Sequence, residues 1–136
     1  MTDENRRANI RDELRRAAEA ERAAAALLEL ALAADAMSRA YYALFHWVRA
    51  LLLTRGVEPR SHAGAVHLFN VEIVAKGSMD PSHNRLLGGL QRLRELADYD
   101  SALVFSVADA RTELERVRAF AAEARALLLR EGWIDP

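Results

Sequence analysis

The sequence predicts an all-α fold, an up-and-down antiparallel helical bundle of four to five helices in a single domain spanning residues 1–136. Three observations support this prediction. Ala, Leu, Arg and Glu, all strong helix formers, dominate the chain. Apolar residues recur at steps of three and four, as on one face of a helix. Ser, Asp, Gly and Pro stand where such stretches begin and end.

The first predicted helix runs from about residue 3 to about residue 33. Its apolar face carries Ile10, Leu14, Ala17, Ala24, Leu28 and Leu32. We expect a break near residues 33–35, where Asp35 can cap the next helix. That second helix covers about residues 36–55 and stops at Gly56, a residue type common just past a helix end.

Two further helices are marked by their ends. The third begins at a capping Ser61 and ends before Gly77. The fourth begins at Asp80-Pro81, because Asp caps a helix and Pro suits its first position, and it runs to about Tyr99.

A glycine pair, Gly88-Gly89, interrupts the fourth helix and predicts either a kink or a closely packed neighbour. The fifth helix begins after Ser106, which resembles the start of a capping box, and runs to about residue 131. Gly132 ends it, and we expect Trp133 to fold back onto the bundle.

Composition restricts the function. The chain has 136 residues, of which 51% are hydrophobic and 29% charged, with a net charge of −1, so it is globular and has no overall positive field to attract nucleic acid. Nucleic-acid binding therefore needs a local patch or a groove shared by two subunits. Cysteine is absent, which excludes disulfides and thiolate chemistry. Without a signal-peptide pattern or a membrane-length apolar run, we expect a cytoplasmic protein that does not contact a membrane.

Residues 38–46, which read SRAYYALFH, are the strongest candidate for a functional segment. Arg39 and His46 lie seven positions apart and therefore share a helix face, with Tyr42 between them. An arginine that binds an anion, beside a histidine that acts as acid and base, is what metal-free cleavage of a phosphodiester requires. The alternative is that Arg39 pairs with a carboxylate and His46 fills a gap between helices.

Two more segments carry candidate ligand-binding residues. Near the end of the fourth helix, Arg94, Asp98 and Tyr99 can hold a phosphate, although an Arg94–Asp98 surface ion pair is the simpler interpretation. Arg60 and His62 flank the start of the third helix, where backbone N–H groups favour anions. The four histidines lack the spacing of a metal site, and we expect no metal and no cofactor.

Taken in order, these segments resemble the HEPN domain family. The resemblance rests on the string SRAYYA-x-F at residues 38–45, Gly56, the Ser61-His62-x-Gly64 opening, Phe69 and the Arg94-x-x-Ala97-Asp98-Tyr99 string. It covers about residues 17–129 and is closest to small stand-alone prokaryotic proteins of the family. It implies a homodimer, a minimal nucleotidyltransferase as partner, and a role in a toxin–antitoxin pair. Trp47 and residues 51–53 would suit a dimer interface if they were exposed.

Active members of that family are metal-independent endoribonucleases whose signature is Arg, four to six residues, then His. Here Arg94 is followed by Asp98 where the histidine would stand, and a carboxylate is a poor acid at neutral pH. Three hypotheses remain open. The protein is a toxin component or nucleotide- or RNA-binding module that uses Arg94, Arg39 and the tyrosines; or it is an endoribonuclease in which His46 is the acid and base; or it is a non-catalytic structural partner of a nucleotidyltransferase.

Overall fold

The structure is a computed structural model that describes residues 2–99 and 105–136. The described elements are α1 (Asp3–Glu29), α2 (Ala33–Thr54), α3 (His62–Phe69), η1 (Asn70–Val74), α4 (Ser82–Tyr99) and α5 (Val107–Arg130), where η1 is one turn of π-helix. No strand occurs in these residues. The predicted all-α bundle is therefore confirmed.

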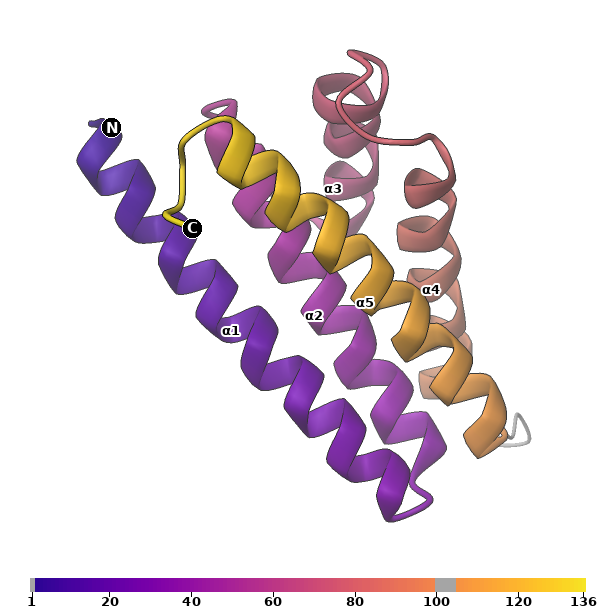
Figure 1. The fold of residues 1–136 in the computed structure, drawn as a ribbon. Helices are drawn as coiled ribbons and strands as arrows, with labels where there is room; N and C mark the ends of the chain where they lie inside the picture. The colour runs from indigo at the N-terminus through magenta and orange to yellow at the C-terminus, as the bar shows by residue number, and fades with distance from the viewer. Residues whose placement is uncertain (1, 100–104) are drawn as a thin grey trace.

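Helix α2 is the centre of the bundle. It packs against α1 as an antiparallel hairpin, and it also contacts α3, η1, α4 and α5. In Figure 1, α5 crosses one side of α2 beside α1, while α3 and α4 stand on the other side. The two chain termini lie at the same end of the bundle. Side chains on α2 can therefore meet partners from several other helices.

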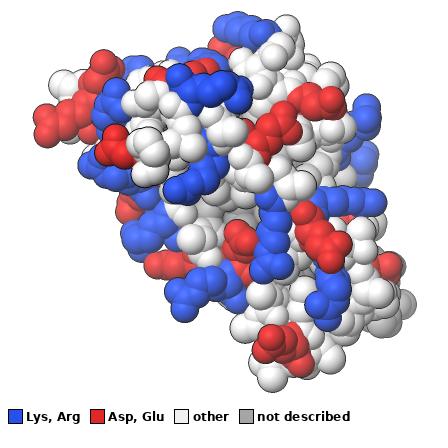
Figure 2. Space-filling model, in the orientation of Figure 1, with Lys and Arg blue, Asp and Glu red and all other residues white. Residues whose placement is uncertain are grey.

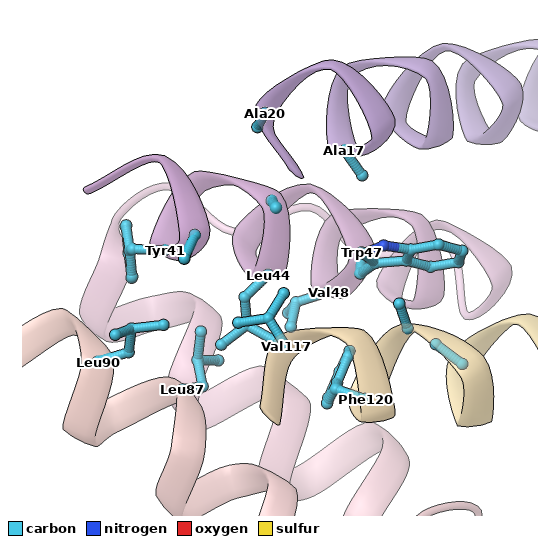
Figure 3. Packing of buried hydrophobic residues seen from close by; sticks show 14 of the residues in the cluster. Ala17, Ala20, Tyr41, Leu44, Trp47, Val48, Leu87, Leu90, Val117 and Phe120 are labelled. Carbon is cyan, nitrogen blue, oxygen red and sulfur yellow. The ribbon is translucent and has the colours of Figure 1, made fainter. Parts of the chain in front are cut away.

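The apolar face of α2 forms most of the core. Tyr41, Leu44 and Val48 are fully buried and point towards Leu87 and Leu90 of α4 and towards α5 (Figure 3). Alanines on the facing side of α1 allow the two helices of the hairpin to approach closely. Trp47 and residues 51–53 are also buried, so the expectation that they could line a dimer interface is wrong.

The predicted helix ends are largely confirmed. Ser61 Oγ accepts a hydrogen bond from Gly64 N at 2.9 Å, and Ser106 Oγ accepts one from Asp109 N at 3.0 Å. Gly56 and Gly132 adopt φ angles of 73° and 76°, in the left-handed region that only glycine enters without strain.

The first break differs from the prediction. Helix α1 ends at Glu29 rather than near residue 33, and the turn is made by Ala31, which has a φ of 60°. Leu32 is the residue before α2 and provides no side-chain cap, while Asp35 lies inside the first turn of α2. Because alanine and leucine are not turn-forming residues, the sequence carries no signal for this turn.

Two other expectations need correction. The third helix is not continuous: α3 gives way to η1, in which Ala75 N bonds Asn70 O at 2.7 Å, one residue beyond the α-helical spacing. A Cβ atom added to Gly88 or Gly89 would meet no heavy atom within 4 Å, so no neighbour packs closely against them. Helix α4 continues through the pair without a break.

The C-terminal residues do fold back, as predicted. The ring of Trp133 lies beneath two guanidinium groups, with its centroid 5.7 Å from Arg6 Cζ and 5.1 Å from Arg7 Cζ. The Arg7 side chain also donates to the carbonyl oxygen of Gly132. We call Arg6, Arg7, Gly132 and Trp133 the terminal cluster, because it joins the start of α1 to the end of the chain.

Candidate anion-binding face

Arg94 of α4 reaches across to the two adjacent tyrosines of α2. Its Cζ atom lies 5.6 Å from the ring centroid of Tyr41 and 5.1 Å from that of Tyr42, and its guanidinium donates to the Tyr42 hydroxyl at 2.9 Å. A cation over the face of an aromatic ring is electrostatically favourable. The sequence predicted Arg94 and Tyr42 as ligand-binding residues, and the structure brings these two into direct contact.

Beneath Arg94, Tyr41 connects α2 to α3. Tyr41 is fully buried, and its hydroxyl forms a hydrogen bond with Nδ1 of His62. Burial raises the pKa of Tyr41 to about 12, although the nearby Arg94 charge acts in the opposite direction. Burial also lowers the pKa of His62, and Arg94 lowers it further. The phenol therefore stays protonated and shares this hydrogen bond with a neutral imidazole, which packs 4.8 Å from the ring of Phe45.

We call Arg94, Tyr41, Tyr42, Phe45 and His62 the Arg94 cluster. Asp98 contacts this cluster only loosely, since its carboxylate lies 3.8 Å from Arg94 and its side chain is 59% exposed. Within the described residues, the Nε atom of Arg94 is buried without a hydrogen-bond partner, as are Nε of Arg6 and Nε1 of Trp47. Leaving a buried donor unpaired is unfavourable for folding, so each of these three donors is held by its surroundings at a cost in stability.

A groove of about 400 Å³ runs beside the cluster between α1 and α2. The groove is lined by Arg16, Glu19, Ala20, Ala23, Arg39, Tyr42 and His46. The predicted trio of Arg39, Tyr42 and His46 is therefore together on one surface, and Tyr42 belongs to both the groove and the Arg94 cluster. Within the described residues, Arg39 forms no ion pair, so the alternative in which it is neutralised by a carboxylate finds no support.

Glu13 of α1 is a site residue that the sequence analysis missed. It is 7% exposed, and its carboxylate accepts from His46 Nδ1 at 2.7 Å and forms an ion pair with Arg49 Nε at 3.1 Å. A signal was available: Glu13 falls three residues after Ile10 and four before Ala17, on the apolar face of its helix. A carboxylate at such a position needs a buried partner.

Other predicted site residues lie apart from this face. Arg60 is exposed and forms no hydrogen bond or ion pair within the part of the chain that the structure describes. The side chain of Tyr99 is 88% exposed and makes no described contact with Arg94. The start of α3 is capped by Ser61, while His62 turns inward to Tyr41. Only His62 of that predicted site therefore joins the cluster.

The face seen in Figure 2 mixes basic and acidic side chains, with no extended field of one sign. This agrees with the net charge of −1 and leaves attraction of an anion to local groups. Within residues 2–99 and 105–136, no group of three or more His, Asp or Glu side chains is arranged so that it could hold a metal ion. Across the same residues, every helix is too short or too polar to cross a bilayer.

Comparison with known proteins identifies the family. The HEPN domain matches residues 10–131, so the chain belongs to the HEPN domain family. Among its relatives is "Putative toxin MJ0605" of Methanocaldococcus jannaschii, 42% identical over 77 residues, which are 57% of this chain and 58% of that protein. "Putative toxin MJ0142" of the same organism is 29% identical over 69% of this chain and 64% of its own length. The chain thus spans less than two thirds of these two relatives.

A third relative is matched over more of its length. The UPF0332 protein glr0978 of Gloeobacter violaceus is 37% identical over 91 residues, which cover 67% of this chain and 72% of that protein.

Proposed function

We propose that this HEPN protein is a toxin component that binds RNA or a nucleotide through the Arg94 cluster and the adjacent α1/α2 groove. The observation that carries the proposal is the position of Arg94, which lies over two tyrosine rings and donates to Tyr42, a residue that also lines the groove with Arg39. Guanidinium groups bind phosphate, and an aromatic ring that reaches solvent, here the half-buried Tyr42, can stack on a base. The toxin role is supported by the names of two relatives.

The family resemblance supports three further parts of the proposal. Two copies would form a homodimer and place two anion-binding faces along one cleft. A minimal nucleotidyltransferase would be the partner that forms the toxin–antitoxin pair. Both would act in the cytoplasm. Sedimentation of the purified protein, alone and with such a partner, tests the two association steps.

The binding proposal is tested by titrating a fluorescent single-stranded RNA with the wild type, Arg94→Ala and Arg92→Ala. Arg92 is the matched control, since it lies on the same helix but lines the separate groove between α4 and α5. We expect Arg94→Ala to weaken binding about tenfold and to reduce the salt dependence by about one counterion. Equal losses in both variants would refute the assigned face. ATP as a competitor tests whether a mononucleotide suffices.

A second function, metal-independent endoribonuclease, is favoured by one observation. His46 lies in the groove beside Arg39, with its Nδ1 atom bonded to Glu13. In this reaction His46 would take the proton of a 2′-hydroxyl as that oxygen bonds to phosphorus, and Arg39 would stabilise the charge there. The bond from phosphorus to the 5′-oxygen would break, and the protonated His46 would return the proton to that leaving oxygen. Incubation of labelled RNA with wild type and His46→Ala, in the presence of a chelator, tests it. Cleavage that is the same in both proteins would rule out this role for His46.

A further inference from the structure

The Glu13–His46–Arg49 arrangement carries an inference that deepens the second proposed function and rests on it. Glu13 is one of two polar or charged residues that are buried within the described chain, and it connects α1 to two residues of α2. A buried carboxylate usually requires specific partners, and here both of its oxygen atoms have one. The question is what this arrangement does to His46.

The carboxylate determines which nitrogen of His46 carries the proton. An ionised carboxylate can only accept hydrogen bonds, so the ring nitrogen that faces it, Nδ1, must be the donor. In a neutral imidazole the other nitrogen, Nε2, then holds the free lone pair. The edge of the ring with Nδ1 faces the buried Glu13. The edge with Nε2 lies on the other side of the ring, and the side chain is 19% exposed and lines the groove.

Arg49 fixes the carboxylate in turn. Its Nε atom forms an ion pair with Glu13 Oε1 at 3.1 Å, while His46 bonds Oε2. Arg49 is itself held in place by the ring of Phe45, whose centroid is 5.9 Å from Arg49 Cζ. Each oxygen of Glu13 thus has its own partner, and together the two contacts fix the plane of the carboxylate.

We propose that Glu13 and Arg49 are positioning residues that hold His46 with its Nε2 lone pair directed into the α1/α2 groove, ready to accept a proton from a hydroxyl beside a bound phosphate. This selects a ribose 2′-hydroxyl, so the substrate class is RNA and not DNA. Neither Glu13 nor Arg49 touches the substrate. The groove supplies Arg39 and Arg16 for the phosphate.

The variant Glu13→Gln tests this with almost no change of shape. The amide oxygen must face the Arg49 donor, so the amide NH₂ group faces His46 and donates to Nδ1. The ring proton then moves to Nε2, which can no longer accept. Glu21→Gln is the matched control, because it removes another carboxylate of α1 that pairs with a different helix through Arg118.

Two measurements separate the inference from the proposed function. Nitrogen-15 NMR of the His46 ring, without RNA, reports the tautomer: we expect Nδ1–H in the wild type and in Glu21→Gln, and Nε2–H in Glu13→Gln. Cleavage of labelled RNA should fall about 100-fold in Glu13→Gln, while RNA affinity changes by less than about twofold.

Each outcome has one meaning. A wild type with Nε2–H overturns the inference without any variant, as does a Glu13→Gln protein that keeps Nδ1–H. If the tautomer changes as expected but the wild type does not cleave RNA, the positioning role stands and the ribonuclease function fails. A DNA strand cleaved as fast as RNA would overturn the choice of substrate.

Discussion

Two clusters in the molecule place arginine side chains over aromatic rings, and the two clusters differ in what they contact. In the terminal cluster, Arg6 and Arg7 cover Trp133, and Arg7 donates to the backbone of Gly132. In the Arg94 cluster, the guanidinium covers Tyr41 and Tyr42 and donates to the Tyr42 hydroxyl. The first contact joins the two ends of the chain. The second presents a cation next to a groove.

The surroundings explain the difference. Near the terminal cluster, Arg55 bonds both carboxylate oxygens of Glu131, at 2.6 and 3.0 Å, but Arg6 and Arg7 form no ion pair within the described residues. Near the Arg94 cluster, Arg39 has no carboxylate partner among the described residues, and Asp98 is 3.8 Å from Arg94. Unpaired arginines therefore occur near both clusters, and what distinguishes the Arg94 cluster is the groove that Tyr42 lines together with Arg39 and His46.

The largest expected effect is on the terminal cluster. We expect Trp133→Ala to lower the free energy of unfolding by about 2 kcal/mol, because a partly buried indole and two cation–aromatic contacts are lost. Urea denaturation measures this. RNA affinity, measured without denaturant, should stay at the wild-type value. A variant that lost RNA binding but kept its stability would reverse the roles assigned to the two clusters.

The helical fold could be predicted from the sequence because its signals are local. Ser61 and Ser106 cap helices, and Gly56 and Gly132 end them, through contacts within a few residues. The predicted position of the first turn was wrong because Ala31 and its neighbours have no preference for turns, so no local signal marks the turn. The π-helical turn of η1 likewise has no sequence signal of its own.

The candidate site was predictable only in part. Helix periodicity placed Arg39, Tyr42 and His46 on one face, and they do line one groove. The contact between Arg94 and Tyr42 joins residues 52 positions apart, which no periodicity can specify. Glu13 was missed because α1 contains many Glu and Arg residues, and most of them are on its exposed side.

A smaller effect tests how Arg94 is held. We expect Tyr42→Phe to weaken RNA binding about fivefold, because the ring remains but the hydroxyl that accepts from Arg94 is lost, a change of about 1 kcal/mol. Fluorescence titration measures it. Tyr99→Phe should be compared in the same assay, since Tyr99 is exposed and its hydroxyl contacts nothing in the described chain. A larger loss in Tyr99→Phe would move the binding surface to the end of α4.

The smallest expected effect concerns the titration of His62. Burial and the charge of Arg94 both lower the pKa of His62 below its usual 6.5, so Arg94→Ala should move that pKa upwards while burial keeps it below 6.5. Proton NMR of the imidazole measures both values. Because the pKa of His62 is lower in the folded protein than in the unfolded chain, the unfolded chain binds this proton more readily. Protonation of His62 therefore lowers the free energy of unfolding.

The stabilisation from a neutral His62 is therefore present above about pH 6.5 and is lost as the pH falls through the folded-state pKa. Replacing His62 with Phe should remove that part of the slope of unfolding free energy against pH, because Phe cannot take up the proton. It would also leave the Tyr41 hydroxyl without its partner, lowering stability at every pH. An unchanged slope would mean that His62 is not shielded as the structure indicates.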